Sequence, residues 1–260
     1  MTQAQEEQPA LRGKQREFLR REQEILNVAR DMLLKNGIIG LAMNSIAEAI
    51  GYATGTVYQH FPCKEEIILA LAIETAQLRF KLLNKAARLR WRARERMMAM
   101  GEVTTILFPR HFHSELLVYT NALRVKTTTE RQEELRIWEA RCFSMGLKVV
   151  QDAVECGDLV LPEDLNAESF YFGLSSMVFG VFGVLNTDVP LDQVGVTNAV
   201  SSLHAFGRSV LDGFGWRPLS TEWDYRKVMK RVYTEVFPEE LRRSINTSEP
   251  ASLGSGADLL

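Results

Sequence analysis

One stretch, residues 43–64, constrains the fold of this chain more than any other. Its first half repeats apolar residues at helical spacing, and Gly51 follows at a position typical of a helix stop. A second short helix is predicted from about Ala53. Two helices joined by so tight a turn form a helix-turn-helix, whose second helix faces outward and can enter the major groove of DNA. The repeated apolar residues are Met43, Ile46, Ala47 and Ile50.

The second helix of this unit is predicted to carry a polar face. Val57 and Phe61 are expected to point inward and anchor the helix, while the side chains between them can donate hydrogen bonds to phosphates or base edges. A glycine between two short amphipathic helices also occurs in helical domains that bind no DNA, so the turn alone does not decide the function. The polar residues are Thr54, Thr56, Tyr58, Gln59 and His60.

From Ile25 to Leu71 the sequence resembles the DNA-binding head of TetR-family transcriptional regulators. The resemblance is carried by a first helix ending at residues 36–37, by residues 46–51 (IAEAIG), by residues 55–61 (GTVYQHF) and by residues 64–66 (KEE). It covers about a fifth of the chain. It implies an all-α fold, in which a three-helix helix-turn-helix head joins a larger helical body for effector binding and dimerisation.

Two positions depart from the family pattern. Ala42 stands where the family usually has a threonine that caps the second helix, and Thr54 stands where a lysine or arginine is common. Asn44 is expected to cap a slightly shorter helix instead. The missing cation at position 54 is expected to affect the nonspecific affinity for DNA more than the fold.

The resemblance and the polar face together predict the DNA contacts. Thr54, Tyr58, His60 and Lys64 are expected to position the protein through phosphates, as the residue matching Lys64 does in the family. Thr56, Gln59 and the backbone of Gly55 are expected to approach base edges, and a glutamine can pair bidentately with adenine. The full predicted set is Asn44, Ala53, Thr54, Gly55, Thr56, Tyr58, Gln59, His60 and Lys64.

The distribution of charge fits this assignment. The formal net charge of the chain is -2, but residues 1–100 hold 16 Lys and Arg against 11 Asp and Glu, a balance of +5, which leaves 15 against 22, or -7, for the rest. The predicted DNA-binding unit therefore lies in the basic part of the chain. Cations near a duplex supply most of the sequence-independent affinity, because they release condensed counterions.

Four regions are predicted along the chain. Residues 1–18 form a flexible basic arm and residues 19–80 the DNA-binding domain, with a first helix from Leu19 to Lys35. Residues 81–244 form the helical body, and residues 245–260, rich in Ser, Gly and Ala, form a disordered tail. The predicted body helices span residues 94–107, 113–123, 129–155, 167–186, 197–214 and 221–237, the last with a capping-box-like start at Thr221.

Residues 170–185 form an uncharged apolar run that falls short of the roughly 20 residues needed to span a bilayer. A buried helix is expected instead. A helix that is apolar all round needs cover on both sides, and one layer of its own body does not readily supply this. By resemblance to the family, this helix and that of residues 197–214 are assigned to a four-helix homodimer interface.

The resemblance also implies an effector cavity in the body, for a small hydrophobic or aromatic molecule. Each candidate lining residue is, taken singly, more typical of ordinary helical core. The candidates are Phe108, Phe112, His113, Tyr119, Trp138, Phe143, Phe170 and Met177.

The sequence shows none of the common catalytic or cofactor motifs: no glycine-rich phosphate loop, no Cys-x-x-Cys and no His-Glu-x-x-His. His111 and His113 would diverge on a helix and could share a metal only in a loop. We expect no metal, no cofactor and no enzymatic activity. Three cysteines without paired spacing indicate a reducing, cytoplasmic setting. Two alternatives remain: a helical enzyme or carrier with a structural helix-turn-helix, and a DNA-binding regulator controlled by a protein partner.

Overall fold

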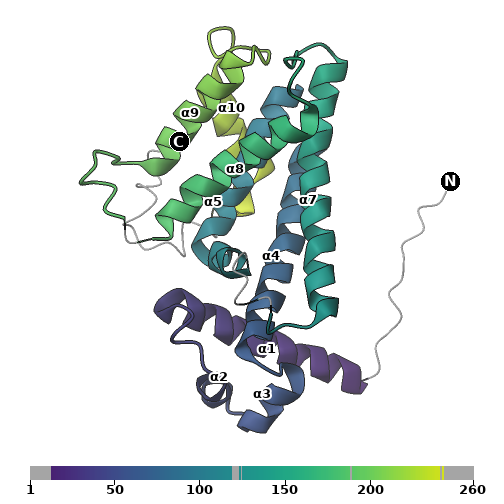
Figure 1. The fold of residues 1–260 in the computed structure, drawn as a ribbon, viewed down its shortest axis with the longest axis vertical. Helices are drawn as coiled ribbons and strands as arrows, with labels where there is room; N and C mark the ends of the chain where they lie inside the picture. Colours follow the sequence, from purple (N-terminus) through teal and green to yellow (C-terminus); the bar gives the residue numbers. More distant parts are fainter. Residues whose placement is uncertain (1–12, 119–122, 124, 188, 241, 243–260) are drawn as a thin grey trace, which may run out of the picture.

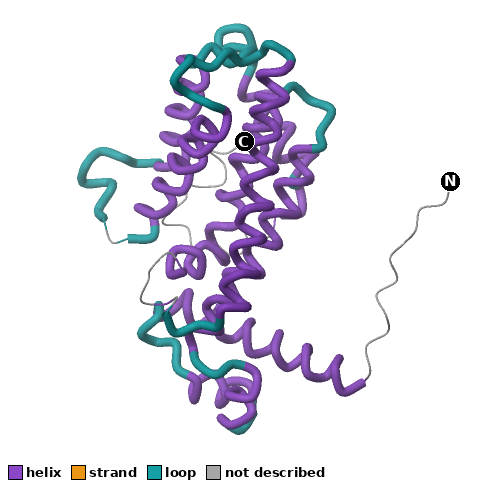
Figure 2. Tube along the Cα trace, turned by 45° about the vertical axis from the view of Figure 1, so that its right-hand side comes forward, coloured by secondary structure: helices purple, strands orange, loops and turns teal. Residues whose placement is uncertain are grey.

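A computed structural model describes residues 13–118, 123, 125–187, 189–240 and 242. Helices joined by loops make up this part of the chain, and no strand occurs among the described residues (Figure 2). The predicted all-α fold is confirmed. A small helical head lies at one end of the molecule, and a body of longer helices extends from it (Figure 1).

The head consists of α1 (Gly13–Asn36), α2 (Met43–Ile50) and α3 (Thr54–His60). Its core is formed where the apolar faces of the three helices meet: Ile25, Ile46 and Val57 are fully buried. Helix α1 begins earlier than predicted, so residues 13–18 are helical and the expected flexible arm is wrong for that part. Residues 1–12 and the predicted tail at 245–260 lie outside the described residues.

Helix α4 (Lys64–Ala87) connects the head to the body without a break. Near its start Ile67 and Ile68 are fully buried in the head core, while Leu82 and Leu83 belong to the body core further along. The boundary predicted between residues 80 and 81 therefore falls inside one rigid helix. A tilt of this helix in the body must move the head as well.

The body contains α5 (Ala93–Val118), α7 (Thr129–Glu155), α8 (Ala167–Leu185), α9 (Ala199–Gly213) and α10 (Tyr225–Arg231), followed by a single π-helical turn, η1 (Val232–Val236). Helices α4, α5 and α7 form a long bundle, and α8 and α9 lie beside each other on one side of it (Figure 1). Side-chain caps explain where the later helices begin, because Asn166, Asn198 and Asp224 each accept a backbone hydrogen bond from the residue three positions on.

Three predicted helix boundaries are wrong. Helix α2 begins at Met43 with Ala42 as its N-cap, so Asn44 lies inside the helix and does not cap it. Helix α5 continues through Pro109, where a loop was expected, because the residues before it are packed into the core and hold the helical path. Helix α10 begins at Tyr225 behind Asp224, and Thr221 starts no helix.

Helix α8 is less enclosed than its apolar sequence predicts. Its most apolar window has a mean hydropathy of 1.4, which by length and composition alone would suit a membrane span, yet only 17% of that window is buried. One helix of this kind is weak evidence for a membrane segment, because apolar helices of soluble proteins have the same length and composition. The exposed side includes Phe172, which is 64% exposed, together with Gly173, Ser176 and Gly180.

Candidate nucleic-acid interface

Helix α3 lies at the outer end of the head (Figure 1), and several of its polar side chains are at least partly exposed. Val57 and Phe61 are fully buried, which confirms them as the anchors of this helix. Tyr58 is 50% exposed, and Gln59 beside it is exposed as well. The helix therefore presents hydrogen-bonding side chains where a groove of DNA could receive them, while its apolar residues fix its orientation.

The turn before α3 is set by Gly51. Its backbone has φ +69°, a left-handed conformation that glycine adopts without strain. The N–H of Gly51 donates to the carbonyl of Glu48 at 3.2 Å, and the N–H of Tyr52 donates to that of Ala47 at 2.9 Å. These bonds close the end of α2 and direct the chain into α3. The hydroxyl of Tyr52 then donates to Glu24 Oε2 at 2.7 Å, which ties the turn to α1.

Eight of the nine predicted contact residues lie at least partly open to solvent around this face. Thr54, Thr56 and Lys64 are half-buried, and Lys64 Nζ donates to the carbonyl of Ile38 at 3.2 Å. Helices α2 and α3 contain no lysine or arginine, so hydrogen-bond donors rather than charges dominate the face. The exposed members are Asn44, Ala53, Gly55, Tyr58 and Gln59.

His60 is the exception. It is 9% exposed, and its ring lies 4.1 Å, centroid to centroid, from the ring of Phe18 on α1. Burial lowers the pKa of His60, which favours the neutral imidazole. A buried neutral ring is not placed to contact a phosphate, so the structure contradicts the predicted phosphate contact. His60 instead packs α3 against α1.

A salt-bridge cluster joins the head to the body. The Glu66 side chain, 2% exposed at the start of α4, lies 3.1 Å from Arg131 Nε on α7 and accepts a hydrogen bond from the backbone N–H of Thr128. Arg131 also reaches Glu22 on α1 at 3.3 Å, and its guanidinium lies 4.9 Å from the centroid of the Phe61 ring. One arginine of the body therefore contacts α1, the residue that ends α3 and the start of α4. Sequence reasoning missed this residue, because nothing local in 129–155 points to it.

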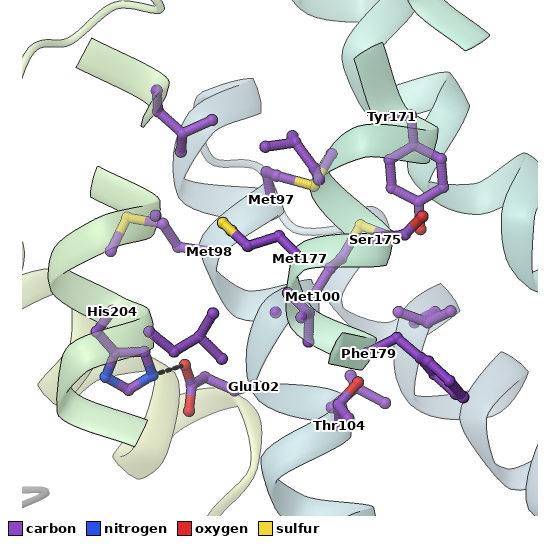
Figure 3. Close-up of a pocket in the computed structure, with 18 of the residues that line it drawn as sticks. Met97, Met98, Met100, Glu102, Thr104, Tyr171, Ser175, Met177, Phe179 and His204 are labelled. Atoms are coloured by element: carbon purple, nitrogen blue, oxygen red, sulfur yellow. Dashed lines mark ion pairs between the residues drawn. The ribbon is translucent and has the colours of Figure 1, made fainter. Parts of the chain in front are cut away.

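The second candidate site is a cavity in the body of about 990 Å³, between α4, α5, α7, α8, α9 and α10 (Figure 3). Of the predicted lining residues, Phe143 and Met177 line it. Phe108 packs against Phe182, Phe170 against Trp216, and Trp138 against Phe80, all away from the cavity, so these three predictions are wrong. The structure does not describe the side chains of Phe112 and His113, and Tyr119 lies outside the described residues.

Methionines that the prediction left out form much of the cavity wall. Met97, Met98 and Met100 come from α5, and Met229 comes from α10. Figure 3 shows Met97, Met98, Met100 and Met177 gathered around the centre of the space. Long unbranched thioether side chains adapt to irregular apolar ligands. The methionine-rich segment at 97–100 was the available sequence signal. Which helix faces surround the cavity, however, depended on the fold.

A buried polar group lies at one edge of the cavity. Glu102 Oε1 lies 2.7 Å from His204 Nε2, and the hydroxyl of Tyr233 donates to Glu102 Oε2 at 2.7 Å. Burial by itself lowers the pKa of His204, but the charge of Glu102 and its hydrogen bond outweigh this and raise the pKa above its ordinary value. Burial, followed by the Glu102 charge, raises the pKa of Tyr233 and keeps it a donor. Both carboxylate oxygens of Glu102 are thus occupied within the protein.

Comparison with known proteins agrees with this architecture. The sequence profile of a family described as "Bacterial regulatory proteins, tetR family" matches residues 25–71. A protein from Saccharomonospora viridis, solved in complex with choline, superposes with a TM-score of 0.61 over 75% of this chain and 96% of its own, at 18% identity. Residues 25–71, which form most of the head, thus match the TetR family.

Two further proteins resemble parts of this chain. The transcriptional repressor AcnR of Corynebacterium diphtheriae is 38% identical over 60 residues, which is 23% of this chain and 32% of that protein. The match thus spans about a third of the repressor's length. AibR, solved with isovaleryl coenzyme A and operator DNA, has a TM-score of 0.52 and 18% identity, covering 71% of this chain and 97% of its own. At such identity the structural likeness shows the fold alone.

Proposed function

We propose that this TetR-family protein is a homodimeric transcriptional repressor, which binds a palindromic operator and is released by a small effector bound in the body. The observation that carries this proposal is the placement of α3: its apolar side chains are buried in the head core, and its polar side chains other than His60 are at least partly exposed to solvent. The repressor relative and the neighbour solved with operator DNA support the same assignment.

In this proposal α3 enters the major groove. Gln59 and Thr56, with the backbone of Gly55, approach base edges, while Tyr58, Thr54 and Lys64 contact phosphates. Two copies of α3, held about 34 to 36 Å apart by a twofold axis, would meet successive major grooves on one side of the duplex. The operator would then carry two half-sites of opposite orientation.

The twofold axis is proposed to pass between α8 and α9 and their mates. Phe172 on α8 is 64% exposed and Phe206 on α9 is 59% exposed, and both helices expose small residues beside these rings. Pairing two such surfaces gives a four-helix interface and removes the apolar area from water. It also explains why an apolar helix has so little cover within one subunit.

The effector is proposed to act through the helices that enclose the cavity. Helix α4 forms part of its wall at Ala76, Arg79 and Leu83, and the same helix carries the head. An effector that binds more tightly to a subunit pair with its heads spread apart shifts the population away from the DNA-bound form. The neighbours solved with choline and with isovaleryl coenzyme A support a small-molecule effector of this kind.

The first experiment selects DNA from a random pool with the full chain and measures affinity for the recovered sequence over a salt series. Lys64→Ala should weaken binding and reduce the slope of log affinity against log salt by about 1 per subunit, because one phosphate contact is lost. Tyr58→Ala should weaken binding with little change of slope, since the phenol carries no charge. Lys148→Ala, which removes an exposed cation of the body, is the matched control.

Recovery of no preferred sequence would refute the operator proposal and favour a helical protein whose helix-turn-helix is structural. An unchanged salt slope for Lys64→Ala would refute only the phosphate role of that residue. A regulator controlled by a protein partner would bind the selected DNA but would not be released by any ligand of the cavity.

A further inference from the structure

We propose that the cavity takes an anionic amphiphile. Its apolar part lies among the methionine and aromatic side chains, and its negatively charged head lies at the edge formed by α9 and α10, against Arg208, Arg226 and Lys230. The proposal rests on the proposed function, in which this cavity holds the effector, and it specifies the chemistry of that effector.

The interior sets the requirement for an apolar body. Met97 and Met100 are buried, and Met98 and Met177 are half-buried around the same space (Figure 3). Phe143 and Phe179 add aromatic surface. A volume of about 990 Å³ lies near the upper end of ligand pockets, which span about 300–1,000 Å³. Filling it with apolar groups removes much more surface from water than a small polar metabolite could.

The edge of the cavity sets the requirement for negative charge. Arg208 on α9 and Arg226 and Lys230 on α10 line the cavity and have exposed side chains. Arg226 and Lys230 are four residues apart, so they share one face of α10. In the described part of the chain no carboxylate forms a salt bridge with any of the three. Among the described residues, three cations thus line the cavity from α9 and α10 without a carboxylate salt-bridge partner.

The carboxylates of the cavity wall do not offset these charges. Glu102 is held by His204 and Tyr233, with both oxygens occupied, and Glu139 has an interaction of its own within the protein. A cationic ligand would therefore meet three like charges and no available anion. An anionic head would gain charge-assisted hydrogen bonds, and an arginine can hold a carboxylate or phosphate bidentately.

Two sources share this chemistry: a free carboxylate on a long apolar chain, and an acyl group carried on a phosphate-bearing carrier. Four probes with the same ten-carbon chain separate the possibilities: decanoate, decanoyl coenzyme A, decan-1-ol and decyltrimethylammonium. Binding to the full chain without DNA is measured by titration calorimetry below the micelle-forming concentration of each probe. At least one of the two anions should bind about tenfold or more tighter than the alcohol, equivalent to about 1.4 kcal/mol, and the cation should bind weakest.

The variant Arg226→Gln/Lys230→Gln tests the edge itself. Both side chains are exposed, so the substitution leaves the core untouched. It should weaken the favoured anion about fivefold to tenfold and leave the alcohol unchanged, because each exposed charge contact contributes modestly. Lys227→Gln is the matched control, since this exposed lysine lies on the same helix but does not line the cavity.

Tighter binding of decanoate identifies a free carboxylate, and tighter binding of the coenzyme A ester identifies a phosphate-bearing carrier. Equal affinities for the anions and the alcohol would overturn the role of the three cations, as would preference for the decyl cation. If no probe binds, the proposed ligand class is refuted. Because these titrations contain no DNA, their failure leaves the operator selection experiment as the separate test of the proposed function.

Discussion

The contact between Arg131 and Glu66 allows a quantitative test of how the body holds the head. Arg131→Met keeps the long apolar stem of the side chain and removes its charge. Glu66 is then left as a carboxylate that is 2% exposed, with only the N–H of Thr128 as a described partner. Losing one partner of a fully buried ion pair costs about 3–5 kcal/mol, because the other charge remains buried.

Two features of the structure determine how much stability Arg131→Met should lose. Arg131 itself is 27% exposed, so water screens the pair and can enter when the guanidinium is gone. The contact of Arg131 with the Phe61 ring adds to the loss, and estimates for such contacts run from about 0.5 to 2 kcal/mol. We therefore expect Arg131→Met to lower the free energy of unfolding by about 2–3 kcal/mol, below the value for a fully buried pair.

A double-mutant cycle separates the charge from the packing. Glu66→Gln combined with Arg131→Met removes both charges, so the double variant should be more stable than Arg131→Met alone. Stability is measured by urea denaturation followed by circular dichroism, and DNA affinity is measured in parallel. Arg136→Met on the same helix is the matched control and should change little, because the salt-bridge partner of Arg136 among the described residues is the exposed Glu133.

A loss below about 1 kcal/mol for Arg131→Met would refute the reasoning, since the buried carboxylate would then have found another partner. A coupling energy near zero between Glu66 and Arg131 in the double-mutant cycle would also refute it. If stability falls as expected while DNA affinity of the folded variant is unchanged, the cluster stabilises the head without setting its position.

Two further predictions concern the body. Gly180→Leu should abolish the dimer in sedimentation while leaving the folded subunit intact, since a Cβ at this position meets nothing within 4 Å in the subunit; a persistent dimer would place the interface elsewhere. His204→Gln should destabilise the protein most at about pH 6 and much less at about pH 9. The raised pKa of His204 means that its ion pair with Glu102 adds stability that is full below the ordinary histidine pKa of about 6.5 and is lost as the pH rises through the folded value. A stability gap between the two proteins that stays constant over this range would contradict the assignment.

Sequence and structure agree best where the interactions are local. The stop at Gly51, the short helix after it and the inward side chains of Val57 and Phe61 all follow from residues within one or two helical turns. Helix α7 begins and ends at the predicted residues, Thr129 and Glu155. Where tertiary packing overrode a local signal, the prediction failed, as at Pro109, which lies inside a helix held by its surroundings.

The sequence by itself determined the all-α fold, the helix-turn-helix and the polar face of α3, because helical periodicity, a left-handed glycine and turn geometry act over a few residues. Only the tertiary structure decided that His60 packs on Phe18, that Arg131 meets Glu66, and which side chains enclose the cavity. These contacts join residues 42 to more than 100 positions apart along the chain. They depend on which helix faces pack against each other. That choice is determined by the burial of apolar surface over the whole chain and not by any short segment.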